Sequence, residues 1–129
     1  MIEKEIRLEK ANKLLEKIAS CGRNFFNYSK DGTVAKFLFK NNRVYYMDEY
    51  TKKEMLTYNY LQFRYFVHGG TMMALVMDIS EWIRTGKYTN GNNGYGGLYC
   101  RHWGYPDKDM VEIRKFATEI GYLKEVSHD

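Results

Sequence analysis

Residues 24–47 read NFFNYSKDGTVAKFLFKNNRVYYM, and this stretch decides the fold. Apolar and polar side chains alternate with a period close to two, which is typical of half-buried strands. Turn residues at 30–32 and 41–42 divide the stretch into three strands at hairpin distances. After another turn-like stretch at 48–53, the sequences EMLTYNY and QFRYFV predict one or two further strands. We therefore expect an antiparallel meander of four or five strands with helices packed on one face.

Three amphipathic helices are predicted around this meander. Residues 3–20 carry apolar side chains at helical spacing. A second helical stripe starts at Met72, with Thr71 as a possible cap, and ends at Gly86; a last helix starts around Pro106 and ends at Gly121. The expected fold class is α+β: an N-terminal helix, the meander, and two C-terminal helices separated by a long loop rich in Gly, Asn and aromatic residues.

Size and composition predict one domain that spans residues 1–129. The chain has 129 residues and no Pro- or Ser-rich stretch at which it would divide. Hydrophobic residues make up 44% of the chain, which is enough for a core and argues against disorder. Twelve residues are Tyr, whose ring and hydroxyl favour interfaces and half-buried ligand pockets. Composition therefore indicates a binding protein without naming the ligand.

Charge and cysteine usage limit the partners and the compartment. The net charge of +4 suits an anionic partner, but the longest basic run is Lys52-Lys53, which argues against nucleic acid. Cys21 and Cys100 are far apart in sequence and imply no disulfide framework. The first twenty residues are charged throughout, and no apolar run is long enough for a bilayer. We expect the cytoplasm, including that of an infected bacterial host.

The sequence carries no catalytic signature. It lacks the G-x-S-x-G elbow, the P-loop, a dinucleotide-binding glycine motif and H-E-x-x-H, so we expect no enzyme and no cofactor. His68 and His102 could act as bases, and Cys100 could act as a nucleophile only if the fold reoriented it toward His102. A lone Cys-x-His is weak for metal, because structural zinc sites need two clustered pairs. An ordinary loop thiol and imidazole are the favoured interpretation.

Two candidate ligand-binding features belong to the central helix. The Gly-Gly-Thr sequence at 69–71 would expose backbone amides at the positive end of the helix, which favours phosphate at Gly70 and Thr71. A tight connection into the helix explains the same residues. Trp82 lies on the apolar stripe, so it is either part of the core or a stacking surface for a base. These two roles of Trp82 do not exclude each other.

The segment 87–105 contains five Gly, three Asn and five aromatic residues without a regular period. Long loops of this kind in compact domains are usually functional, and the aromatics argue against disorder. Asn90, Asn92 and Asn93 suit left-handed turns, or hydrogen bonds to a base or ribose. Four arginines are either surface charges or phosphate clamps. They are Arg64, Arg84, Arg101 and Arg114.

Three stretches together resemble a known family. They are GRNFFNYSKDGTVAKFLFKNNRVYYMDEYTKKE, FRYFVHGGTMMALVMDISEWIRTG and HWGYPDKDMVEIRKFA. The shared pattern is a G-R-x-F-F start, a strand and turn ending in D-x-Y-T-x-K, an H-G-G-T turn before a helix, and W-G-Y before a final helix. Over nearly the whole chain, this pattern resembles the first-described anti-Thoeris sponge proteins of phages and prophages.

The resemblance implies an anti-defence function. Such proteins sequester cyclic ADP-ribose isomers made by host defence enzymes, do not cleave them, and assemble as dimers or higher oligomers. The implied ligand residues are an aromatic, an Asn and arginines of the last helix. Carried onto this chain, they fall on Trp82, on Asn92 or Asn93, and on Arg114.

The resemblance is incomplete at the phosphate clamp. A second Arg is expected one turn before Arg114, but that position holds Met110. Arg101 or Arg64 could replace it. The residue chemistry alone does not distinguish a cyclic ADP-ribose from a dinucleotide.

Two other functions stay open. The chain could be a phage-encoded inhibitor that binds a host defence complex through its Tyr-rich surface. It could also be a small nucleic-acid-binding protein, a reading favoured only by its pI of about 9.0.

Overall fold

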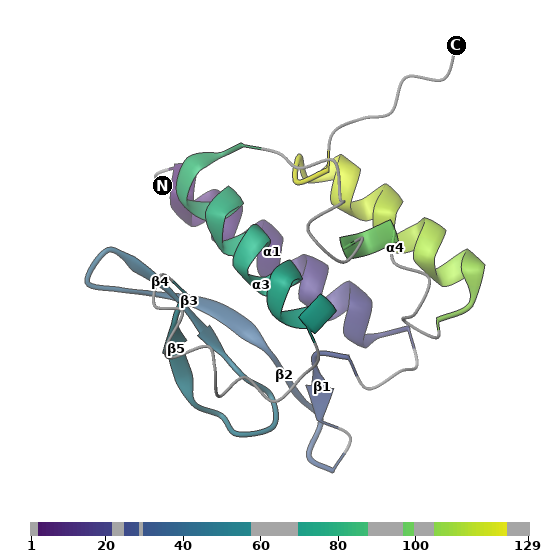
Figure 1. Ribbon diagram of the computed structural model, residues 1–129, viewed down its shortest axis with the longest axis horizontal. Helices are drawn as coiled ribbons and strands as arrows, with labels where there is room; N and C mark the ends of the chain where they lie inside the picture. Colours follow the sequence, from purple (N-terminus) through teal and green to yellow (C-terminus); the bar gives the residue numbers. More distant parts are fainter. Residues whose placement is uncertain are drawn as a thin grey trace.

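The computed structural model describes residues 3–21, 25–28, 30–57, 70–87, 97–99 and 105–123 (Figure 1). Its elements, in chain order, are α1 (Glu3–Ala19), β1 (Asn27–Tyr28), β2 (Thr33–Val34), β3 (Lys36–Lys40), β4 (Arg43–Met47), β5 (Glu54–Leu56), α3 (Gly70–Thr85), η1 (Gly97–Tyr99) and α4 (Asp107–Glu119). The predicted α+β class is confirmed: an N-terminal helix, antiparallel strands and two C-terminal helices.

The strands form two antiparallel sheets. β1 pairs with β2, and β3, β4 and β5 follow one another in a three-stranded sheet. The predicted strand over 33–40 is divided at Ala35, whose N–H donates to the carbonyl of Phe26 at 2.8 Å while the next residues pair with β4. The predicted strand QFRYFV, and the end of EMLTYNY after residue 57, lie outside the described residues.

Both predicted hairpin turns are confirmed. Asn41 and Asn42 have φ values of 50° and 63°, the left-handed backbone that a two-residue type I′ turn requires. They connect Lys40 to Arg43, which face each other across the β3–β4 pair. In the β1–β2 hairpin, Gly32 has φ 73° and donates its N–H to the carbonyl of Tyr28 at 2.8 Å. The turn chemistry therefore fixes the register of both hairpins.

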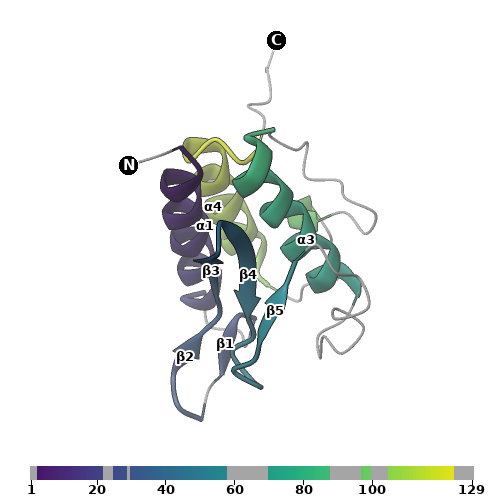
Figure 2. The same ribbon diagram turned by 90° about the vertical axis from the view of Figure 1, so that its left-hand side faces the viewer.

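Helices α1 and α3 pack on one face of the three-stranded sheet, and α4 lies on the far side of this helix pair (Figures 1 and 2). Strand alternation provides the apolar face: Phe37, Val44, Tyr46 and Met55 are all buried. Their neighbours along the strands, such as Tyr45, are more exposed. The core therefore lies between the sheet and the helices, as the period-two pattern predicts.

Helix α1 contributes its second half, from Ala11 onward, to this core. Ala11, Leu14, Leu15 and Ile18 are completely buried, which confirms the predicted stripe. On the same helix, Asn12 covers the edge of β3: its Oδ1 accepts from the N–H of Phe37 at 2.7 Å, and its Nδ2 donates to the Phe37 carbonyl at 3.0 Å. A side-chain amide thus satisfies backbone groups that an edge strand would leave unpaired.

The boundaries of α3 and α4 agree with the predicted start and stop signals, except at the start of α3. Gly86 and Gly121 follow the two helices with φ values of 76° and 89°, and Pro106 directly precedes α4. The start of α3 differs, because Gly70 already has helical backbone. Thr71 is therefore the second residue of the helix, and its predicted role as the cap is wrong by two positions.

Candidate functional site

Residues 97–99 of the Gly/Asn-rich segment form η1, which contacts both α3 and α4 and lies between them (Figure 1). Leu98 is completely buried and anchors the turn in the core. Tyr99, the next residue, is 44% exposed. One short turn therefore combines a buried anchor with an exposed aromatic side chain.

Arg114 connects this turn to α4. Its Nη1 donates to the carbonyl of Leu98 at 3.1 Å, and its Cζ lies 4.9 Å from the centre of the Tyr99 ring. The second distance is typical of a cation–π contact. Arg114 is half-buried on α4, so packing restricts the position of its guanidinium. The sequence predicted Arg114 as a ligand residue, and the structure places it against the flagged segment.

The Tyr99–Arg114 pair suits a particular ligand chemistry. A guanidinium has five N–H donors, and the bond to Leu98 uses one of them. An exposed aromatic ring beside a cation can take a planar ring on the aromatic and an anionic group on the cation. Sequence reasoning flagged the aromatics of 87–105 together but did not single out Tyr99. The available signal was its position in that segment.

Trp82 belongs to the core. It is 3% exposed, and its ring meets the Tyr122 ring edge-on at 5.6 Å. The Tyr122 hydroxyl donates to Oδ2 of Asp78, one turn earlier on α3, at 2.6 Å. Burial and the Asp78 carboxylate raise the pKa of Tyr122 well above its ordinary value, so the phenol keeps its proton. The core interpretation of Trp82 is confirmed, and its ligand role stays a prediction.

The other candidates divide by position. Met110 is buried in the core beside Ile113, which explains an apolar residue where the resemblance expects a second Arg. Gly70 and Thr71 form the first turn of α3, so their backbone belongs to the positive end of that helix. Arg84 is half-buried in the last turn of α3. The remaining candidates lie outside the described residues. These are Arg64, His68, Asn90, Asn92, Asn93, Cys100, Arg101 and His102.

Two features are absent from the described residues. None of the helices that the structure describes is long and apolar enough to cross a bilayer. Among the same residues, no group of three or more His, Cys, Asp or Glu side chains is arranged to hold a metal ion.

Fold and site together define a small α+β protein with an aromatic–arginine pair held between two helices. The chain belongs to the YoqU family, whose model matches residues 2–129. It is similar to the SPbeta prophage-derived uncharacterized protein YoqU of Bacillus subtilis (strain 168), with 33% identity over 125 residues, 95% of this chain and 86% of the relative. No solved structure matches the chain. The predicted phage origin is confirmed, whereas the anti-Thoeris identity stays a prediction.

Proposed function

We propose that this protein binds a cyclic ADP-ribose isomer, or a related cyclic nucleotide, and sequesters it without cleavage. The observation that supports this is the pairing of exposed Tyr99 with Arg114 on the turn between α3 and α4. A prophage-encoded relative fits a role in blocking host antiviral signalling. The motif resemblance to sponge proteins points to the same ligand class.

The ligand needs an aromatic face for its base and donors for its phosphates. Tyr99 supplies the face, and the N–H groups of Arg114 other than the one that donates to Leu98 supply charge-assisted donors. A net charge of +4 favours the approach of an anion. Sequestration requires complementarity to the ligand as it is, because no transition state has to be stabilised. The absence of catalytic motifs in the sequence agrees with binding alone.

Calorimetry tests this proposal directly. Cyclic ADP-ribose isomers are titrated into the protein, with linear ADP-ribose and NAD as comparison ligands. We expect Tyr99→Ala to weaken binding about tenfold through lost stacking. Tyr99→Phe keeps the ring and should bind nearly as well. Arg114→Lys keeps the charge but loses the planar fork and should weaken binding. Val111→Ala, at an exposed position on the same helix, is the matched control.

The bound ligand is then released by heating and analysed by chromatography. Intact ligand supports sequestration, and chemically altered ligand would show an enzyme instead. If the isomers bind but neither Tyr99→Ala nor Arg114→Lys weakens them, the site assignment is wrong even though the function is right. If no isomer binds, the proposed function is wrong.

A further inference from the structure

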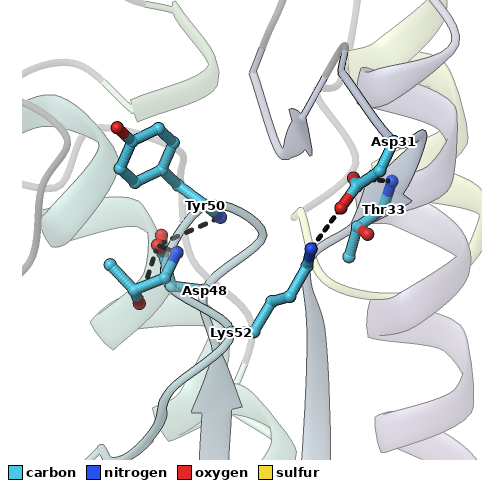
Figure 3. Close-up of polar contacts among 6 residues, drawn as sticks. Asp31, Thr33, Asp48, Tyr50 and Lys52 are labelled. Carbon is cyan, nitrogen blue, oxygen red and sulfur yellow. Dashed lines mark hydrogen bonds and ion pairs between the residues drawn. The ribbon is translucent and has the colours of Figure 1, made fainter.

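The turn between β4 and β5 is closed by several hydrogen bonds and carries an exposed aromatic residue. Oδ2 of Asp48 accepts from the N–H of Thr51 at 2.8 Å, from its hydroxyl at 3.1 Å, and from the N–H of Tyr50 at 3.2 Å (Figure 3). The backbone closes the same turn, since the N–H of Lys52 donates to the Asp48 carbonyl at 2.8 Å. Tyr50 is nevertheless 57% exposed. The turn therefore presents this ring outward from a fixed backbone.

A second hairpin supports the same ring. Lys52 forms an ion pair with Asp31 in the β1–β2 turn, so the two hairpins lie side by side (Figures 1 and 3). Nζ of Lys52 also lies 5.7 Å from the ring centre of Tyr28. The Tyr28 ring meets the Tyr50 ring edge-on at 5.0 Å. This contact uses one part of the Tyr50 ring and leaves the rest of it in solvent.

On the surface of these two turns, exposed lysines outnumber exposed carboxylates. Lys30, Lys52 and Lys53 are exposed, and they come from two turns about twenty residues apart. Lys52 and Asp31 neutralise each other, which leaves Lys30 and Lys53 as the lysines that phosphates would contact. The acidic residues of the β4–β5 turn, Asp48 and Glu49, are each 1% exposed and contribute little to the surface. We call the surface formed by Tyr28, Lys30, Tyr50, Lys52 and Lys53 the turn face.

We infer that the turn face binds single-stranded nucleic acid, with one base stacked on Tyr50 and phosphates on the lysines. Aromatic rings combined with basic side chains are how proteins hold single strands without reading their sequence. A protein partner fits less well, because lysine is depleted at protein interfaces and hot-spot aromatics lie within patches that exclude water. The exposed neighbours of Tyr50 are instead Thr51, Lys52 and Lys53. This inference does not depend on the proposed function.

The sequence pointed away from nucleic acid because it shows no long basic run. The fold changes this, because the Lys52–Asp31 ion pair joins the turn that carries Lys30 to the turn that carries Lys53. The D-x-Y-T pattern also has a structural meaning here, because Asp48 accepts from the N–H of Tyr50 and from the N–H and hydroxyl of Thr51.

Fluorescence anisotropy at low salt, with a labelled oligothymidine of about 15 nucleotides, tests the inference. The same strand in a duplex is measured beside it, because pairing hides the base faces. We expect the single strand to bind more tightly than the duplex. Tyr50→Ala should weaken single-strand binding about tenfold, and Tyr50→Phe should keep it. Val111→Ala, away from the turn face, should leave it unchanged.

The lysines are tested by salt dependence. Replacing Lys30 and Lys53 together by Gln should lower the slope of log affinity against log salt by about 1.4, at roughly 0.7 per phosphate contact. Polyglutamate serves as an anion without bases and should compete poorly. Equal competition by polyglutamate, equal affinity for the duplex, unchanged binding by Tyr50→Ala, or no binding at low salt would each overturn the inference. Circular dichroism of each variant confirms that it is folded.

Discussion

At the scale of single residues, tyrosine has two different roles in this protein. Tyr46 and Tyr122 are completely buried, and burial together with neighbouring Glu49 and Asp78 raises the pKa of each phenol well above its ordinary value. Tyr50 and Tyr99 are exposed and lie near a cation or a cation-bearing turn. The number of tyrosines in the composition predicts a binding function, but only exposed tyrosines can contact a ligand.

The ion pair between Asp31 and Lys52 leads to a prediction about pH. The hydrogen bond from Lys52, and then the N–H of Thr33, lower the pKa of Asp31 from 3.8 to about 2. Because the folded-state pKa is depressed, the stabilisation is complete above about pH 4 and is lost as the pH falls toward 2. The stability of Asp31→Asn should therefore fall less over this interval than that of the original protein.

Urea midpoints at several pH values, together with an NMR titration of the Asp31 carboxyl, measure this. Lys52→Gln is the second arm, and it should move the Asp31 titration back toward its ordinary pKa. The effect on stability will be small, because the pair is solvent-exposed. An Asp31 titration that does not move in Lys52→Gln would contradict the assigned cause.

At the scale of elements, the helix ends follow local sequence, but one of them also depends on a distant residue. Nε of Arg7, on α1, donates to the carbonyl of Ile83 at 3.0 Å in the last turn of α3. A cation at this end of a helix is favourable, because the last carbonyls carry partial negative charge. A Cβ added at Gly86 would lie 3.2 Å from Nη1 of the same arginine. The end of α3 is therefore tightly packed against α1.

Gly86→Ala and Gly121→Ala form a matched pair that tests this packing. Both glycines have positive φ, so each alanine should cost about 1 kcal/mol in backbone strain. At Gly121 nothing lies within 4 Å of the added carbon, whereas at Gly86 the alanine crowds Arg7 and its bond to Ile83. We expect Gly86→Ala to lose about 1 kcal/mol more in urea unfolding. Equal losses in the free energy of unfolding would show that the Arg7 side chain moves aside without destabilising the protein.

At the scale of the whole molecule, α1 connects every layer. It packs against β2 and β3 through one side and against α3 and α4 through another, and the buried residues of all these elements form one apolar cluster. Such a shared core favours a single cooperative unfolding transition. The prediction that residues 1–129 form one domain also requires a single unfolding transition.

Urea unfolding of the Trp103→Phe variant tests this, because Trp82 is then the only tryptophan. Trp82 lies on α3 and is buried against Tyr122, so its fluorescence reports on the packing of the helices. We expect the fluorescence and far-UV circular dichroism transitions to coincide. A fluorescence change at lower urea would show that the helices separate first.

Light scattering of the native protein at the same concentration tests the expected homo-oligomer.

Sequence by itself determined much of the local structure. The 3.6-residue stripes, the glycines at 86 and 121, and the Asn41-Asn42 turn act over a few residues, so the helices and hairpins could be predicted from them. Only the tertiary structure decided which residues are available for a ligand. It buries Trp82, places Tyr99 on Arg114, and pairs Lys52 with Asp31 of the neighbouring hairpin. Periodicity could not show this, because exposure and pairing depend on contacts between elements far apart in the chain.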